Sequence, residues 1–253
     1  MLLLLLACRS IDPAPADLDG LAHYLWQNGE LGDDATVAEA IENLDAVVGA
    51  MEEREDGQLT RLSTEEADLV SPRGDFDPAN AAGIFMANRF NGCTPEQLER
   101  VLIHAAQDEI REDTYQSYER VYLSDDAAFR DGSAERLGWK VDIAADIIGA
   151  DYTEKLQGGI RRVETEVGPA WVQITWMTEA AVFDNDSNYW NQDYQLEVYW
   201  QPENRETLHL YGMWRELQVF GFSSENQGVQ GQVLNGLADW DDATAQLCLE
   251  NRP

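Results

Sequence analysis

The chain has 253 residues, of which 44% are hydrophobic, and it carries a formal net charge of -31. This length and apolar content are enough for one sizeable core and argue against wholesale disorder. The negative charge would repel phosphate backbones and anionic lipid headgroups. Composition therefore argues against nucleic-acid binding and against electrostatic docking on a membrane.

The chain starts with an apolar run that ends in Leu5-Leu6-Ala7-Cys8. This ending resembles the lipobox of bacterial lipoprotein signal peptides, where small residues before a cysteine allow its thiol to be acylated. The resemblance implies that residues 1–8 are the signal, that Cys8 receives the lipid, and that residues 9–16 form a short tether. The protein would then be a lipoprotein of the cell envelope, periplasmic or on the outer surface, and would touch the membrane only through its lipid.

This apolar run is shorter than such signals, and no basic residue precedes it. We therefore expect a truncated signal with the true start codon upstream; a chance match in a cytosolic protein is the alternative. Export would leave Cys93 and Cys248 as a pair in an oxidising compartment, where a disulfide can form. Two buried free thiols are the alternative, because pairing requires the two Cα atoms to lie within about 7 Å.

The N-terminal part of the chain has helical periodicity. Apolar residues that share one helical face recur at Leu18, Leu21 and Leu25, and again at Val37, Ile41, Leu44, Val48 and Met51. This spacing predicts a helical hairpin over residues 17–56. After this, charged residues, glycine and proline interrupt the helical spacing of apolar residues. This change predicts an irregular linker over residues 57–93.

Residues 94–253 are predicted to form an α+β domain. Thr94, Pro95 and Gln97 mark a helix start, because they form a capping-box pattern with proline at the first helical position. Apolar residues then alternate with period two over Trp139–Ala145 and Tyr194–Trp200, which is typical of half-buried strands. Short connections favour antiparallel neighbours. We predict N-terminal helices, an antiparallel sheet of about five to six strands, and a C-terminal helix near residues 229–247.

This order of elements resembles the helix-grip plan of START-like lipid-binding domains. In that plan a curved antiparallel sheet wraps a long C-terminal helix and encloses an apolar cavity. The resemblance lies in the order of elements and in no sequence motif, and fold order alone does not license function. The final helix carries Val233, Leu234, Leu237 and Trp240, which can either plug the sheet or border a cavity.

No pattern in the sequence points to catalysis or to a cofactor. The three histidines, His23, His104 and His209, lie in different predicted elements without a metal-ligand spacing, and no nucleophile elbow or nucleotide-binding loop is present. Oxygen-bearing side chains do alternate at Asp184, Asp186 and Asn188, as in a calcium loop. Tyr189 and Gln195 stand where an EF-hand loop needs glycine and glutamate, so we expect a hairpin turn there instead.

The predicted sheet is rich in aromatic residues, which can line a pocket or cover an interface. We take Trp176, Trp200 and Trp214 as candidate ligand-facing residues. The leading hypothesis is a non-enzymatic, lipid-anchored envelope protein that binds an apolar small molecule or a protein partner through this sheet. One alternative is a structural lipoprotein without a cavity. The other is an enzyme of undetected type, which close carboxylates in a cleft, or a histidine with a carboxylate partner, would favour.

Overall fold

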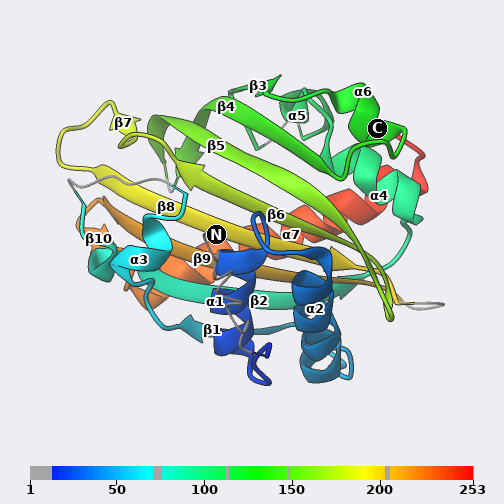
Figure 1. Ribbon diagram of the computed structural model, residues 1–253. Coiled ribbons are helices and arrows are strands. Elements are labelled where there is room, and N and C mark those ends of the chain that lie inside the picture. The colour runs from blue at the N-terminus through cyan, green and yellow to red at the C-terminus, as the bar shows by residue number, and fades with distance from the viewer. Residues whose placement is uncertain (1–12, 71–75, 112–113, 148, 203–205, 253) are drawn as a thin grey trace, which may run out of the picture.

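The structure is a computed structural model that describes residues 13–70, 76–111, 114–147, 149–202 and 206–252. Within these ranges the strands form one antiparallel sheet in the order β1-β2-β9-β8-β6-β5-β4-β3, with β10 paired to β9 and β7 to β5 (Figure 1). The strands are β1 Glu55–Leu59, β2 Ala82–Phe90, β3 Ser117–Tyr122, β4 Arg136–Ile147, β5 Ala150–Thr165, β6 Gly168–Met177, β7 Val182–Phe183, β8 Tyr189–Trp200, β9 Thr207–Val219 and β10 Phe222–Ser223.

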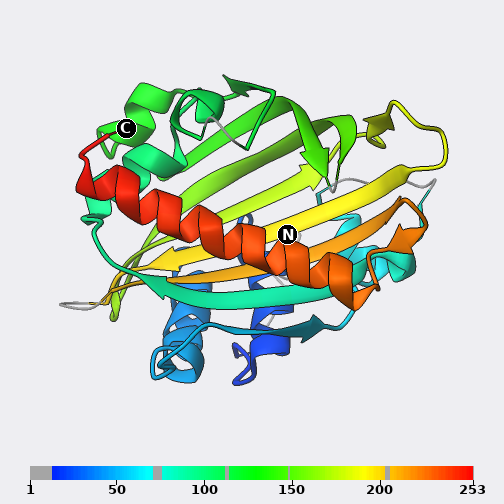
Figure 2. The same ribbon diagram turned by 180° about the vertical axis from the view of Figure 1, so that it is seen from behind.

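Helices cover both faces of this sheet. They are α1 Leu18–Asn28, α2 Asp34–Val48, α3 Thr64–Ala67, α4 Pro95–Leu102, α5 Gln107–Ile110, α6 Asp126–Arg130 and α7 Gln227–Leu249, with a 3-10 turn at Pro78–Asn80. The hairpin of α1 and α2 lies on one face, and α7 crosses the other face diagonally (Figures 1 and 2). We call these the hairpin face and the α7 face. No helix in the described ranges has both the length and the apolar content to cross a membrane.

The predicted fold class is confirmed as α+β with a large antiparallel sheet and a C-terminal helix, but the strand count was wrong. The described residues form ten strands, not five to six. Segment 57–93 is not an irregular linker, because it contains most of β1 and all of β2. Strand β2 escaped prediction because it is buried on both faces and so lacks the alternation that marks a half-buried strand. The division into domains stays a prediction.

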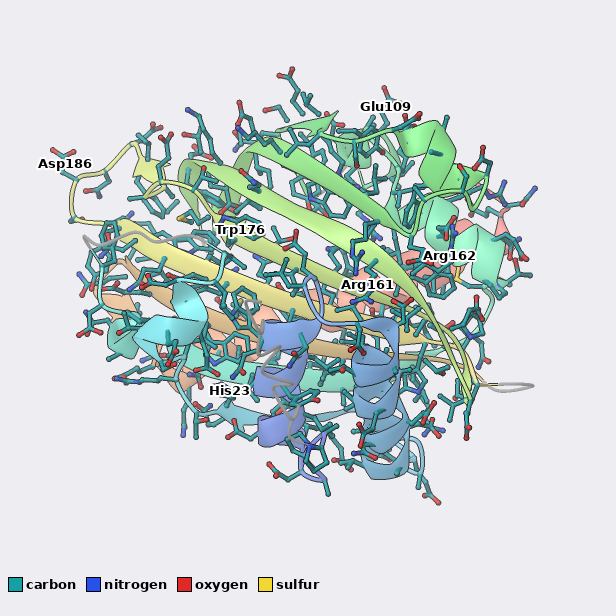
Figure 3. The ribbon with its side chains drawn as sticks, viewed as in Figure 1. His23, Glu109, Arg161, Arg162, Trp176 and Asp186 are labelled. Atoms are coloured by element: carbon teal, nitrogen blue, oxygen red, sulfur yellow. A yellow bond between two sulfur atoms is a disulfide. The ribbon has the colours of Figure 1, made fainter. Side chains whose placement is uncertain are left out.

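On the hairpin face, the two helices pack directly on the sheet. Leu21, Leu25 and Trp26 of α1 and Ile41 and Leu44 of α2 are all buried against the sheet. Two side chains fix the position of this hairpin (Figure 3). The first, Arg161 of β5, donates to the carbonyl oxygen of Gly32 at 2.8 Å and also pairs with Asp34.

The second is His23 of α1. Its Nδ1 lies 2.7 Å from Oε1 of Glu66, a residue of the short helix α3 that follows β1. Burial opposes ionisation of Glu66, but hydrogen bonds from His23, Ser63 and Gln27 outweigh it and lower the pKa of Glu66 to about 2. The rim of the hairpin face is therefore held by paired, ionised groups.

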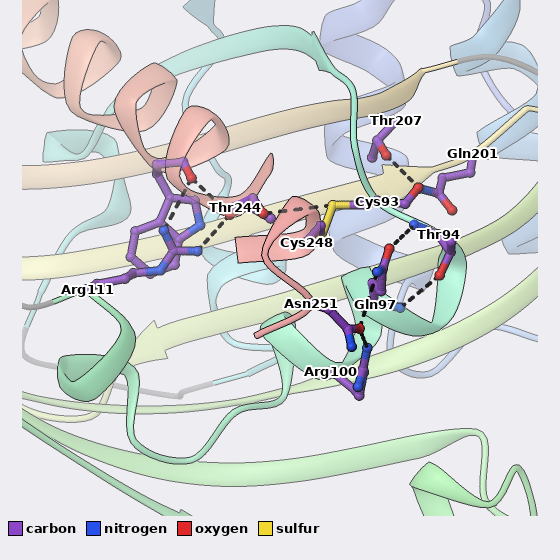
Figure 4. Close-up of a disulfide and its surroundings, with 11 residues drawn as sticks. Cys93, Thr94, Gln97, Arg100, Arg111, Gln201, Thr207, Thr244, Cys248 and Asn251 are labelled. Carbon is purple, nitrogen blue, oxygen red and sulfur yellow. Dashed lines mark hydrogen bonds between the residues drawn. A yellow bond between two sulfur atoms is a disulfide. The ribbon is translucent and has the colours of Figure 1, made fainter. Parts of the chain in front are cut away.

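The C-terminal end of α7 is joined covalently to the segment between β2 and α4. Cys93 and Cys248 form a disulfide, with their Cα atoms 4.9 Å apart (Figure 4). Just beyond it, Arg100 Nη2 donates to Asn251 Oδ1 at 2.8 Å. The pair that the sequence singled out thus fastens the last helix to the body of the protein.

Candidate functional site

A cavity of about 340 Å³ lies between the α7 face of the sheet and α7 itself. Strands β3, β4, β5, β6, β8 and β9 form its floor and walls, and α7 closes it with Val233, Gly236, Leu237 and Trp240. Large aromatic rings make up much of the lining, among them Tyr115, Trp139, Tyr152, Trp190, Tyr211 and Trp240. We call this space the α7 cavity.

A second hollow of about 360 Å³ lies over β3, β4 and β5 near β7. Its lining includes the exposed charged residues Glu119, Asp142, Lys155 and Glu179. Ligand sites are usually concave and mostly apolar with a few placed polar groups. The α7 cavity fits that description better, and it is therefore the candidate site.

Three arginines stack on three tryptophans around the α7 cavity. The guanidinium carbon lies 4.4 Å from the ring centre for Arg120 on Trp139, 4.0 Å for Arg215 on Trp190, and 3.3 Å for Arg111 on Trp240. Such cation–π stacking stabilises a partly desolvated guanidinium group against the face of the ring. The arginines thus pack against tryptophan rings in the cavity wall.

Arg215 is neutralised by a carboxylate. Its Nε and Nη2 donate to Asp193 at 2.9 and 3.0 Å, which is a bidentate geometry. Burial alone would lower the pKa of Arg215, but the charge and hydrogen bonds of Asp193 raise it above its usual value. The positive charge of Arg215 is therefore balanced by the carboxylate of Asp193.

Glu154 of β5 lines the cavity in a different state. Glu154 is only 6% exposed, and its Oε2 has no hydrogen-bond partner among the described residues. Burial raises the pKa of Glu154 to about 8, with repulsion from Asp193 adding to the shift and Arg215 opposing it. At neutral pH this carboxyl group is mainly protonated.

Glu197 of β8 is a second carboxyl group in the lining, and it does have partners. The Tyr199 hydroxyl donates to it at 2.8 Å, and Gln173 Nε2 donates to its other oxygen. Burial raises the pKa of Glu197, which the nearby His209 partly opposes.

A histidine and an aspartate connect α7 to the sheet. His209 Nδ1 of β9 lies 2.8 Å from Asp241 Oδ1 of α7, and Asn88 of β2 donates to the other Asp241 oxygen. This is the kind of pair that would favour an enzyme. However, His209 is 1% exposed and does not line the α7 cavity. The pair therefore acts as a tie between helix and sheet.

The three tryptophans predicted to face a ligand do not line this cavity. Trp176 (labelled in Figure 3), Trp200 and Trp214 lie in the core beneath the hairpin, on the opposite side of the sheet. Two of their indole N–H groups form hydrogen bonds on that side. Trp214 Nε1 donates to the Thr60 carbonyl oxygen, and Trp200 Nε1 donates to Asp45.

The physical reason is strand alternation. In β6, β8 and β9 the cavity receives odd-numbered side chains such as Gln173, Glu197 and Met213, whereas the three tryptophans have even numbers. Trp190 reaches the cavity only because a bulge between Trp190 and Gln192 shifts the register. Alternation groups residues by face, but it does not reveal which face is hollow.

The remaining predicted positions lie elsewhere. Asp184 and Asp186 (the latter labelled in Figure 3) are exposed in the loop between β7 and β8. Asn188 is buried and accepts from the Phe220 backbone at 2.9 Å. They form a turn, and no cluster of metal-ligand residues is found among the described residues. Cys8 lies outside the described residues.

The sequence reasoning missed Glu154 and Glu197. A signal was available for Glu154, since it lies between Tyr152 and Leu156 on one face of a period-two strand. A charged residue at an inward position is costly unless it is paired or functional, and that conflict could have been used to find it.

Comparisons with known proteins give only a distant likeness. No family model matches the chain, and no curated protein matches it. A STAR-related lipid transfer protein fragment from Xanthomonas axonopodis is 10% identical with a TM-score of 0.39, covering 64% of this chain and 76% of that one.

Two human structures are similar to the same degree. The StarD13 lipid transfer and protein localization domain is 10% identical with a TM-score of 0.42, covering 79% of this chain and 85% of that one. StAR-related lipid transfer protein 5 is 8% identical with a TM-score of 0.41, covering 86% and 96%. These are the class that the element order resembles, but TM-scores below 0.5 permit no inference about this protein. The fold and site define an α+β protein with a cavity between sheet and helix.

Proposed function

We propose that this protein is a non-enzymatic binding protein that holds an apolar small molecule in the α7 cavity. The observation that carries the proposal is the cavity itself, about 340 Å³ with aromatic walls. Ligand pockets are typically about 300–1,000 Å³. A purely structural protein would fill this space with its own side chains, as it does on the hairpin face.

The polar groups of the cavity add to this proposal. Arg120, Glu154 and Glu197 lie among the aromatic rings of the lining. A few placed polar groups in an apolar pocket orient a ligand. The ligand is therefore an amphiphile, with an apolar body and one polar end.

The proposal extends to location. The lipobox-like residues before Cys8 support acylation of that cysteine and attachment to the bacterial cell envelope. Mass spectrometry of the membrane fraction tests this: a diacylated or triacylated N-terminal Cys8 is expected, and Cys8→Ser is expected to release the protein. An unmodified chain recovered from the cytosol would contradict it.

The test of binding is mass spectrometry of an organic extract from the Cys8→Ser chain, exported to a bacterial periplasm and purified without detergent. We expect one apolar molecule per protein. A filled cavity is the matched test, because a Cβ added at Gly236 would meet no heavy atom within 4 Å and Gly236 lines the cavity. Gly236→Phe is therefore expected to abolish the retained molecule.

The control variant is Gly231→Phe. Gly231 is also on α7, and its added Cβ would likewise meet nothing within 4 Å, but it does not line the cavity. Both changes replace a helical glycine, so their effects on helix propensity are matched. If Gly231→Phe and Gly236→Phe lose the molecule equally, or if the folded parent protein is empty and binds no amphiphile, the proposed function is wrong.

A further inference from the structure

We propose that the α7 cavity selects ligands whose polar end is a cation, an amine or a quaternary ammonium group, and that Glu154 binds this group. This inference rests on the proposed function, since it names the ligand class of the same cavity. It is carried by an unpartnered, buried carboxyl group in the lining.

The other charged side chains of the lining already have partners. Arg215 donates twice to Asp193. Arg120 donates to the Tyr118 hydroxyl through Nε and Nη2 and to the Leu102 carbonyl oxygen through Nη1.

The two remaining carboxylates of the lining, Asp146 and Glu197, also accept hydrogen bonds. Asp146 accepts from the Gly149 backbone at 2.8 Å, and Glu197 accepts from Tyr199 and Gln173. Within the described residues, Glu154 alone among the charged groups of the lining has an oxygen that is buried and without a partner. A buried polar group without a partner is costly, so a ligand that supplies one gains that energy.

The surroundings of Glu154 favour a cation as that partner. Repulsion from Asp193 is a larger influence on its carboxyl group than attraction to Arg215, and Arg215 is already paired. The empty site therefore keeps a proton on Glu154, as the direction of its pKa shift indicates. A bound cation can take the place of this proton and form a charge-assisted contact with the carboxylate.

Aromatic faces near Glu154 suit the same ligand. Tyr115 and Tyr152 line the cavity together with Glu154, and Tyr152 precedes Glu154 by two residues on the same face of β5. Tyr152 packs 5.1 Å from Trp190, and Tyr115 packs 5.0 Å from Tyr118, measured between ring centres. A carboxylate beside aromatic faces is the arrangement that recognises ammonium groups.

Charge at longer range acts in the same direction. The chain has a net charge of -31, and such a field raises the local concentration of cations and lowers that of anions. Of the two cavity arginines, Arg215 is neutralised by Asp193. Arg120 keeps its charge, but its donors are taken by Tyr118 and Leu102. A carboxylate or phosphate ligand would have to displace those contacts.

At a pH below the pKa of Glu154, binding of a permanent cation must release a proton from its carboxyl group. The protonated carboxyl group loses its proton to solvent as the cation arrives, so the charge of the site is conserved. The other titratable or charged groups that face this cavity are Tyr115, Tyr118 and Arg120 around β3, Asp146 of β4, Tyr152 of β5, Glu197 of β8, and Tyr211 and Arg215 of β9. Asp193 of β8 does not line the cavity but acts on Glu154 through its charge. The cavity-lining residues of α7 are not titratable.

Isothermal titration calorimetry of the Cys8→Ser chain with three eight-carbon probes tests the proposal. The probes are octyltrimethylammonium, 1-octanol and octanoate, measured in two buffers of different ionisation enthalpy. We expect the quaternary ammonium to bind tightest, with roughly one proton released per molecule at pH 7 and almost none at pH 9. Its affinity is expected to rise about tenfold between those pH values, while that of octanol stays constant.

Glu154→Gln is expected to remove the proton release and the preference for the ammonium probe while octanol still binds. Glu164→Gln is the matched control, since it makes the same chemical change on the same strand at an exposed residue that does not line the cavity, and it is expected to behave as the parent. Tighter binding of octanoate, or an unchanged ammonium preference in a folded Glu154→Gln variant, would overturn the inference but leave a binding cavity. Failure of all three probes to bind the parent would overturn the proposed function as well.

Discussion

The two faces of the sheet are built from the same strands, yet they are covered in opposite ways. Beneath the hairpin the space is filled, with Leu25, Ile41, Trp200 and Trp214 essentially inaccessible to solvent. Beneath α7 the same strands leave a cavity of about 340 Å³ with carboxyl and guanidinium groups in its walls. A filled face gains most of its stability from apolar burial, whereas a hollow face must be held closed by other contacts.

Those other contacts are visible along α7. Asp241 of α7 lies 2.8 Å from His209. Figure 4 shows two further contacts: Thr244 Oγ1 accepts from Arg111 at 2.7 Å, and Cys248 is bonded to Cys93. The hairpin has no covalent tie in the described residues. Helix α7, which lies over the cavity, is therefore held by specific contacts at a few positions, whereas the hairpin is held mainly by continuous apolar packing.

The largest expected effect is on the pH dependence of stability, which has opposite signs on the two faces. The pKa of Glu154 is raised to about 8, so the folded protein keeps a proton that the unfolded chain loses. The free energy of unfolding should therefore fall as pH rises from about 4.5 to about 8, by up to about 5 kcal/mol. Denaturant unfolding across this range checks it, and Glu154→Gln should flatten the slope.

Glu66, at the rim of the hairpin face, is expected to show the reverse. Its pKa is lowered to about 2, so its contribution is present above the pKa of the unfolded chain and is lost as pH falls from about 4.5 to about 2. Glu66→Gln should remove only this acid-side loss. If both variants follow the parent curve at every pH, the contrast between the two carboxyl groups does not exist.

The disulfide gives the next largest effect. It joins residues separated by 155 positions, and closing so long a loop is expected to stabilise the protein by about 4 kcal/mol. The double variant Cys93→Ser with Cys248→Ser should unfold at correspondingly lower denaturant concentration. Reductant should lower the midpoint of the parent and leave the double variant unchanged. An equal response of the two proteins to reductant would show that the bond does not contribute.

The smallest expected effect is a difference between two leucines. Leu196 is fully buried on the hairpin face, whereas Leu156 borders the α7 cavity. Leu196→Ala should cost about 4 kcal/mol and Leu156→Ala about 2 kcal/mol, because the second side chain has fewer contacts to lose. Denaturant unfolding of both variants measures the difference. Equal losses would mean that the cavity is filled in solution.

The sequence by itself determined the elements with strong local signals. Thr94, Pro95 and Gln97 form the predicted capping box at the start of α4. The apolar stripe of Val37, Ile41, Leu44 and Val48 is buried as one face of α2. The last helix, predicted near residues 229–247, spans Gln227–Leu249. Capping and periodicity depend on residues close in the chain, so these features can be predicted locally.

Only the tertiary structure decided which face of the sheet is hollow. Trp176 and Thr175 are neighbours in β6, yet one packs under the hairpin and the other lines the α7 cavity. Alternation fixes that they face opposite ways, but which cover lies on each side depends on contacts between residues far apart in the chain. The same holds for Glu154, whose lack of a partner follows from the placement of Asp193 and Arg215 on two other strands.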